Sequence, residues 1–215
     1  MNFEYLREVA PQLLQGLSVT VEATAVGMTM ACVLGLIVAS VRLLRIPILG
    51  RVFGLYVLFF RNTPFLIQLY FLFYVLPEWG IVLSAMVVGI LGLALQYSAY
   101  TAEMYRAGFE SIPKAQWEAA HALNFNSLQT LRLIILPQAI RPILPALGNQ
   151  LISMFKDSSL LAAITILELF GTARQLASVS FQFTTLFTAV GLIYFALSYP
   201  SSILVNRLQS RFGRL

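Results

Sequence analysis

The sequence is poor in charged residues, cysteine and histidine. Only 11% of its 215 residues are charged, 59% are hydrophobic, and the mean hydropathy is +0.81. A soluble domain carries about 25% charged residues, so a chain of this composition requires lipid rather than water around much of its surface. The single cysteine, Cys32, excludes a disulfide within the chain and argues against a cysteine metal cluster.

Two kinds of chemistry are also missing. The chain has no GxxxxGK(S/T) phosphate-binding loop, so it does not hold ATP by that route. Its only histidine, His121, lacks cysteine or acid at metal-ligand spacing nearby, which argues against an enzyme and against a resident cofactor or metal. The net charge of +5 is placed as in the cytoplasmic loops of a membrane protein, so we expect no nucleic-acid partner.

Long apolar stretches predict an all-α integral membrane protein, because a spanning helix needs about 20 mostly apolar residues. We expect five spans in a single transmembrane domain over residues 1–215, at 17–41, 52–76, 81–105, 138–155 and 186–204. The second stretch is interrupted by the letters RNTP. The apolar segment 158–170 is too short to cross a bilayer, so a half-helix or re-entrant piece is expected between the fourth and fifth spans.

The basic residues predict the orientation of the chain by the positive-inside rule. One side receives three groups of cations: Arg42, Arg45 and Arg51; Arg106, Lys114, Arg132 and Arg141; and Arg207, Arg211 and Arg214. The other side receives only Arg7, Lys156 and Arg174. The N-terminus is therefore expected outside and the C-terminus in the cytoplasm, which makes residues 106–136 a cytoplasmic loop.

The loop at 106–136 has helical signals of its own. Ser111 and Pro113 suit a helix start, the letters KAQWEAAHAL favour a helix, and Asn126 offers a second cap before LQTLRLII. The pattern predicts two short helices joined by a tight turn across the inner face of the membrane. An amphipathic helix of this kind either rests on lipid headgroups or docks against a partner, and the residues alone leave both roles open.

A longer spaced pattern runs through this loop. Glu118-Ala119-Ala120 is followed after three residues by Asn124 and, after nine more, by Ile134-Ile135-Leu136-Pro137. This pattern resembles the EAA-x3-G-x9-I-x-LP signature of the membrane subunits of bacterial binding-protein-dependent ABC importers. Asn124 replaces the usual glycine, and asparagine is the residue that next best tolerates a left-handed backbone. Three further stretches are similar to the polar amino acid branch of that family: FFRNTPFLIQL (59–69), YSAYTAEMYRAGFESIP (97–113) and MFKDSSLLAAI (154–164).

The resemblance implies a permease half in the bacterial cytoplasmic (inner) membrane. Its implied partners are a dimer of ATP-binding subunits that binds ATP and Mg²⁺, a second permease subunit, identical or homologous, and an extracytoplasmic solute-binding protein. The EAA helix would be the coupling helix that docks into the ATPase, and Glu118 its decisive polar contact. The residues implied in coupling are Gly108, Trp117, Glu118, Ala119, Ala120 and Asn124. Of these, Gly108 and Asn124 would shape the turns around Glu118.

Polar residues within the spans are candidates for a substrate path, because such residues face the bundle interior or water. On the fourth span, Pro142, Pro145, Asn149, Ser153 and Lys156 recur at helical spacing. If Ser158 opens a helix, its N-terminus would add a site for a carboxylate. The candidate path residues for a polar amino acid or amino-acid-like solute are Arg61, Thr63, Gln68, Asn149, Ser153, Lys156, Asp157, Ser158 and Ser159.

Several alternatives stay open at this level. The stripe on the fourth span also suits contacts between helices, and Lys156 and Asp157 could pair with each other. Arg61 shares a helical face with Pro64 and Gln68 and needs an acid, for which Glu22, Glu103 and Asp157 are candidates. Glu103 itself reads as a boundary charge. An ATP-independent channel or secondary transporter is the alternative function.

Overall fold

The computed structural model describes residues 1–44 and 46–212, and within them the secondary structure is helical with no strand. Arg45, Arg214 and the side chain of Arg211, which belong to the predicted cytoplasmic charge, lie outside this description. The α-helices are α1 (Phe3–Leu43), α2 (Pro47–Asn62), α3 (Phe65–Tyr70), α4 (Ala85–Glu110), α5 (Lys114–Ala122), α6 (Ser127–Thr130), α7 (Leu136–Asp157), α8 (Leu169–Ser180) and α9 (Phe183–Phe212).

Short helical segments that are wound more tightly or more widely than an α-helix join several of these helices. They are the π-helical turns η1 (Phe71–Val75) and η3 (Leu131–Ile135) and the 3₁₀ helices η2 (Leu76–Trp79) and η4 (Ser158–Ile164). In the described chain, four helical stretches are long and apolar enough to cross a membrane, and α2 with the stretch Phe65–Trp79 adds a fifth if that bent pair counts as one span. The protein is thus a bundle of spanning helices.

Helices α1 and α4 form the closest helix pair of the bundle, and small residues let their backbones approach. Gly35 of α1 lies against α4 so closely that an added Cβ would sit 3.0 Å from the backbone nitrogen of Ala102 and from the carbonyl oxygen of Ser98. In the same contact, the buried Thr101 hydroxyl donates a 2.9 Å hydrogen bond to the carbonyl oxygen of Ala31. Small residues and interhelical hydroxyls are the usual means of helix packing in lipid.

The second predicted span is broken rather than straight. Thr63 and Pro64 are extended, and the helical pieces on either side of them are bent by 108°. Proline lacks an amide hydrogen and forces the residue before it out of the helical conformation. Gln68 compensates, because its Nε2 donates to the freed carbonyl oxygens of Phe60 (3.2 Å) and Thr63 (3.1 Å). The spacing had predicted that Arg61 and Gln68 share one face of a continuous helix, and this prediction is wrong because the helix is broken between them.

The segment 158–170, predicted as one half-helix or re-entrant piece, is instead divided between two helices. Residues Ser158–Ile164 form the 3₁₀ helix η4, which ends at Thr165 with a left-handed φ of 70°. The α-helix begins only at Leu169, where the Glu168 carboxylate accepts hydrogen bonds from the amides of Phe170 (2.9 Å) and Gly171 (2.6 Å). The N-cap, rather than the apolar run, sets this helix start.

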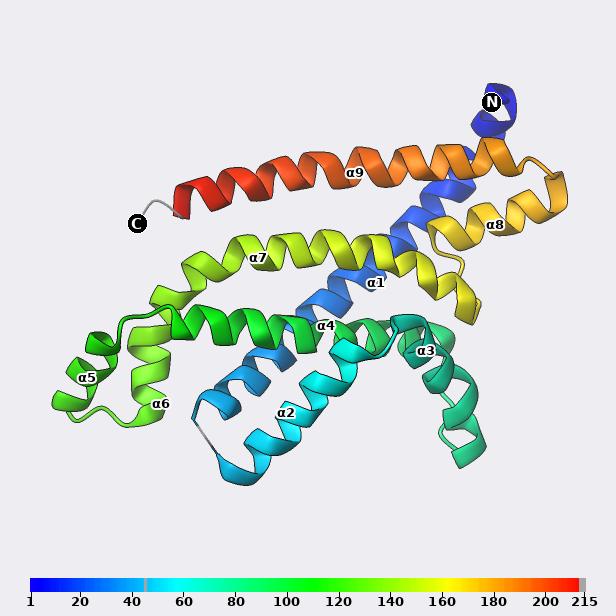
Figure 1. Ribbon diagram of the computed structural model, residues 1–215. Helices are drawn as coiled ribbons and strands as arrows, with labels where there is room; N and C mark the ends of the chain where they lie inside the picture. Colours follow the sequence, from blue (N-terminus) through cyan, green and yellow to red (C-terminus); the bar gives the residue numbers. More distant parts are fainter. Residues whose placement is uncertain (45, 213–215) are drawn as a thin grey trace.

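The two ends of the bundle differ (Figure 1). The α1–α2 connection, the pair α5 and α6, and the C-terminal end of α9 lie toward one end, whereas the N-terminus and α8 lie toward the other. The first end carries Arg42, Arg51, Arg106, Lys114, Arg132 and Arg207, and the second carries Arg7 and Arg174. The fold therefore gathers most of the described cations at the end that holds α5.

The α1–α4 contact makes a stability prediction. Replacing Gly35 by valine should destabilise the folded chain by about 1–3 kcal/mol, because the added methyl groups meet backbone atoms of α4 that cannot yield. Gly54→Val is the matched control, since a Cβ at Gly54 meets nothing within 4 Å. Thermal unfolding in detergent measures both variants. Equal melting temperatures for the two would contradict this description of the α1–α4 contact.

Candidate functional site

Helix α5 stands out from the bundle as a short, polar and largely exposed element. Glu118 and Ala119 are exposed, whereas Ala120 is fully buried. Trp117 is half-buried and packs against an apolar cluster that includes Tyr105 and Phe109 of α4. One side of α5 is therefore anchored to the ends of the spans, and the side that carries Glu118 and Ala119 is free.

The turn after α5 depends on Asn124. Its φ of 58° is left-handed, the conformation that the usual glycine of the pattern adopts freely and that asparagine tolerates. The turn is closed by a 3.1 Å hydrogen bond from the Phe125 amide to the carbonyl oxygen of Ala120. Asn126 then caps α6 in a capping box with Gln129, each side chain accepting from the other's backbone amide at 2.9 Å.

Gly108 lies at a different kind of contact from the one expected of it. It is a buried residue within α4, and an added Cβ would fall 2.4 Å from the side chain of Ile143 on α7. It permits the close approach of α4 and α7 rather than shaping a turn beside Glu118. Of the six predicted coupling residues, five thus belong to α5 and its turn, and Gly108 supports them from the bundle.

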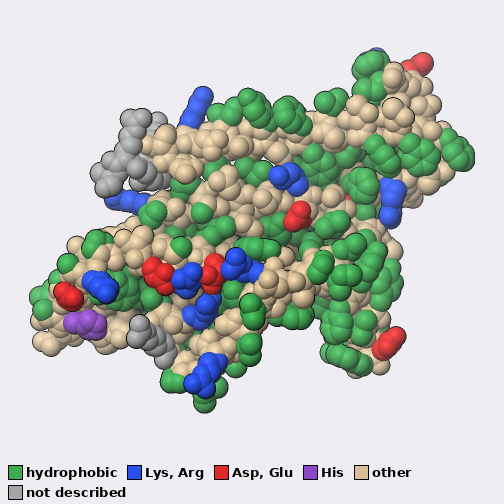
Figure 2. Space-filling view, viewed as in Figure 1, with side chains coloured by type: hydrophobic (Ala, Val, Ile, Leu, Met, Phe, Trp, Pro, Cys, Tyr) green, Lys and Arg blue, Asp and Glu red, His purple; other side chains and the backbone are tan. Residues whose placement is uncertain are grey.

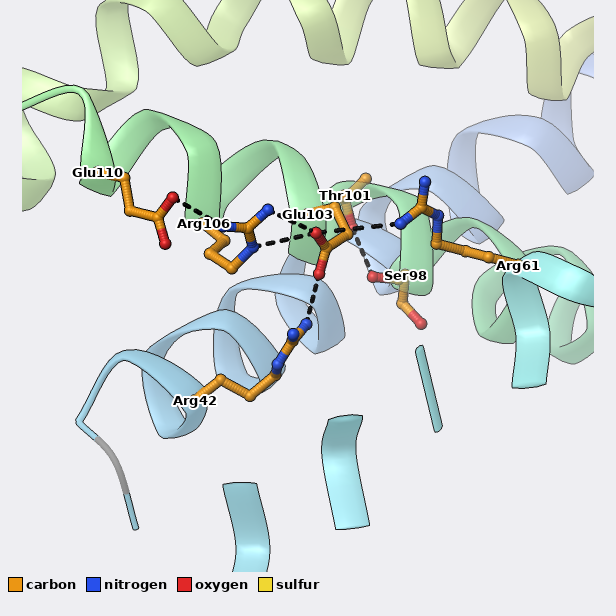
Figure 3. Close-up of polar contacts among 7 residues, drawn as sticks. All are labelled: Arg42, Arg61, Ser98, Thr101, Glu103, Arg106 and Glu110. Carbon is orange, nitrogen blue, oxygen red and sulfur yellow. Dashed lines mark hydrogen bonds and ion pairs between the residues drawn. The ribbon is translucent and has the colours of Figure 1, made fainter. Parts of the chain in front are cut away.

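A cluster of charges lies where α1, α2 and α4 meet (Figure 3). The Glu103 carboxylate accepts from the guanidinium of Arg42 on α1 and from that of Arg106, at 2.9 Å, one turn along α4. Arg61 of α2 completes the cluster with a longer contact of 3.9 Å. Glu110 binds the other side of Arg106 at 2.7 Å.

The structure identifies the acid that pairs with Arg61, for which the sequence left three candidates. It is Glu103, and neither Glu22 nor Asp157 forms an ion pair with Arg61 among the described residues. The interpretation of Glu103 as a simple boundary charge was incomplete, because its side chain is only 20% exposed and is shared by three guanidinium groups. Charged groups at membrane depth require such partners.

A polar network continues from Arg61 along α4. The Arg61 guanidinium lies 5.7 Å from the ring centre of Tyr100, which suits a cation–π contact. The Tyr100 hydroxyl accepts a 3.4 Å hydrogen bond from Gln96, whose Oε1 accepts at 2.6 Å from Gln68 Nε2. Gln68 also donates to the Thr63 hydroxyl at 2.7 Å, so the three path residues predicted on the second span do come together.

The polar residues of α7 are only partly aligned. Asn149, Lys156 and Asp157 are exposed and Ser153 is half-buried, whereas Pro145 is buried and so lies off this stripe. Asp157 accepts a 2.7 Å hydrogen bond from the Tyr97 hydroxyl of α4. The ring centres of Tyr97 and Tyr100 are 6.1 Å apart, so α4 joins the α7 stripe to the network around Arg61.

The end of α7 differs from two possibilities that the sequence left open. Ser158 does not open an α-helix toward a ligand, because it is buried and its hydroxyl donates to the carbonyl oxygen of Phe155 at 2.7 Å. Lys156 and Asp157 form no ion pair with each other in the described part of the chain. Ser159 is half-buried at the start of η4. Asp157 reaches α4 through its side chain, which accepts the hydrogen bond from Tyr97.

Sequence reasoning overlooked Glu168. Its side chain is fully buried and receives, besides the two α8 amides, the hydroxyls of Tyr194 (3.1 Å) and Thr20 (3.4 Å). This carboxylate therefore links α1, α8 and α9. The signal was present, since an acid inside an apolar run is a candidate for a specific role, but the run had been read as a helix interior.

Comparison with known proteins identifies relatives along most of the chain. A family model for the "binding-protein-dependent transport system inner membrane component" matches residues 31–214. A probable amino-acid ABC transporter permease protein of Sinorhizobium fredii is 40% identical over 198 residues, which cover 92% of this chain and 86% of that relative. A second one, from Vibrio harveyi, is 38% identical over 196 residues, with coverages of 90% and 88%.

One solved structure is also close. It is described as an amino acid ABC transporter with histidines, and it matches this fold with a TM-score of 0.90 and 31% sequence identity. The match covers 98% of this chain and 99% of the other.

The charge cluster predicts a specific loss of stability. Glu103→Gln should lower the stability of the folded chain by about 1–3 kcal/mol, because three guanidinium groups from three helices lose their common carboxylate. Glu110→Gln is the matched control; its carboxylate is 58% exposed and binds only Arg106, so a loss below about 1 kcal/mol is expected. Thermal unfolding compares the two, and an equal loss would contradict the central role of Glu103.

Proposed function

The chain belongs to the family of binding-protein-dependent transport system inner membrane components and is a permease subunit of an ABC importer, and we propose that its cargo is a polar amino acid or an amino-acid-like solute. Its task is transport, and ATP hydrolysis belongs to a separate ATPase subunit of the importer. The same membership disfavours an ATP-independent channel or secondary transporter. The relatives support the cargo, and α5, a helix anchored to the bundle on one side and exposed on the other, supports the coupling role proposed next.

We propose that α5 is the coupling helix. Its exposed residues Glu118 and Ala119 form a small surface with one acid, on which a groove of an ATP-binding subunit can close tightly. Trp117 and Ala120 hold the opposite side of α5 against α4 and η3. A displacement of α5 would therefore be transmitted to the spanning helices. The ATP-binding subunits, which would form a dimer, hold ATP and Mg²⁺; this chain needs no cofactor of its own for the role.

The proposed orientation places the N-terminus outside and α5 in the cytoplasm of a bacterial cell, with the chain in the cytoplasmic membrane. The support is the gathering of Arg42, Arg51, Arg106, Lys114 and Arg132 at the α5 end of the bundle. An extracytoplasmic solute-binding protein would then deliver substrate at the end that holds α8.

A second permease subunit, identical or homologous, would cover the polar stripe of α7. Asn149, Lys156 and Asp157 are exposed on a helix of membrane-spanning length, where polar side chains facing lipid are costly. Pairing two such bundles would place both stripes at a shared interior. The substrate would cross between the two subunits by alternating access.

The polar groups near this stripe suit a zwitterion, which needs a cation for its carboxylate and acceptors for its ammonium group. Arg61 supplies a guanidinium that is 44% exposed and bound to Glu103 only at 3.9 Å. Gln68 Oε1 is buried with no hydrogen-bond partner in the described residues, and Asp157 adds a carboxylate. We propose that these groups make a weak, transient site for an amino acid during its passage, with Thr63, Ser153 and Lys156 along the path.

The coupling proposal predicts that Glu118→Lys abolishes ATP-driven uptake in reconstituted vesicles. The substitution reverses the charge of the exposed Glu118 side chain, so the chain should no longer recover the ATP-binding subunit in a pull-down from membranes. Glu78→Lys is the control, because Glu78 is also exposed but lies in η2, away from α5. Normal uptake by the Glu118→Lys variant would exclude α5 as the coupling helix.

The path proposal predicts a different phenotype. Lys156→Ala and Asp157→Ala should each reduce uptake at least about tenfold, because a desolvated charge partner of the zwitterion is worth 1.4 kcal/mol or more. The ATP-binding subunit should still be recovered with both variants. Arg7→Ala removes an exposed cation outside the path and should leave uptake unchanged. Wild-type uptake and ATPase coupling in both path variants would reject this site.

A further inference from the structure

A groove of about 610 Å³ lies between the ends of α1 and α4 and the inner side of α5. Its lining includes the cationic side chains of Arg42, Arg106 and Lys114 and one acid, Glu110. Its wall is apolar and is built by Leu43, Ile112 and Trp117. The groove therefore combines a cluster of positive charge with a surface suited to hydrocarbon.

The cations of this groove exceed the acids near them. Arg42 and Arg106 share Glu103, and Arg106 also binds Glu110. Lys114 is exposed and forms no ion pair among the described residues. The three cations that line the groove thus have two paired carboxylates, Glu103 and Glu110, and Glu103 is also shared with Arg61. Figure 2 shows these charged side chains gathered on one face, over α4 and α5, with apolar side chains around them.

The position of the groove favours an anionic lipid over a small free anion as its ligand. It opens where two spanning helices end, at the level where a bilayer presents its headgroups, and Trp117 is the kind of residue that lies at this interface. A small free anion would use the cations and leave the apolar wall wet. A lipid with a negative headgroup uses both, since basic pockets between spanning helices on the cytoplasmic side bind such headgroups.

We propose that this groove is a binding site for an anionic phospholipid of the cytoplasmic leaflet. The headgroup phosphate would lie near Lys114 and Arg106, and an acyl chain would run along Leu43 and Ile112. The assignment to the cytoplasmic leaflet rests on the orientation given under Proposed function. Because α5 forms one wall, a bound lipid would hold the coupling helix against the ends of α1 and α4.

The test uses the fluorescence of Trp117 in the full chain. Trp79, the only other tryptophan, is replaced by phenylalanine, and the chain is placed in vesicles with equal amounts of phosphatidylglycerol and phosphatidylcholine. Bromine atoms on the acyl chains of one lipid or the other quench the tryptophan on contact. We expect stronger quenching by brominated phosphatidylglycerol. Equal quenching by the two brominated lipids would overturn the proposal.

Charge variants separate a built site from general attraction to an anionic surface. Lys114→Gln should lower the preference for phosphatidylglycerol about fivefold, the effect of one juxtamembrane cation near such a surface. Arg132→Gln is the matched control, because Arg132 is an exposed cation of the same loop that does not line the groove. An equal loss in both variants would mean diffuse attraction and would reject the site.

A competition experiment distinguishes a lipid from a small anion, and the design keeps the result independent of the proposed coupling function. If added inorganic phosphate abolishes the preference, the groove is a site for small anions and the lipid assignment is wrong; a preference that persists supports the lipid. The measurement needs neither ATP nor an ATP-binding subunit, so failure of the Glu118→Lys experiment does not alter its result. Loss of lipid preference, conversely, leaves the uptake result standing.

Discussion

The carboxylate of Glu103 is the contact on which the α5 end of the bundle depends. It receives Arg42 from α1, Arg61 from α2 and Arg106 from its own helix. Three guanidinium groups this close would repel one another without a shared anion. The ends of α1 and α2 are thereby tied to α4, the helix from which the loop to α5 departs.

From that fixed end the chain builds a small exposed helix with little freedom. Trp117 packs on the cluster around Tyr105 and Phe109, Ala120 is buried, and the left-handed Asn124 turns the chain directly into α6. Force applied to the exposed side of α5 therefore reaches α4 through packed side chains rather than through a slack loop. This packed connection is what the proposed coupling role of α5 requires.

Most of the architecture could be predicted from the sequence, because apolar runs of spanning length and the spaced EAA pattern depend on residues near one another in the chain. Asn124 illustrates this, since its left-handed turn follows from the glycine it replaces. The partner of Arg61 could not be predicted, because the contact with Glu103 joins helices far apart in sequence. The short helix was misplaced because the run at 158–170 is apolar throughout, whereas its start is set by the Glu168 cap and the turn at Thr165.

The most direct test of α5 as the coupling helix is a photo-crosslinking experiment. A photoreactive amino acid at position 119, on the exposed side of α5, is introduced into the full chain, and native membranes are irradiated. The predicted result is a crosslink to an ATP-binding subunit, with a yield that changes when ATP is added. Crosslinks to lipid alone, in membranes that still perform ATP-driven uptake through this chain, would contradict the claim.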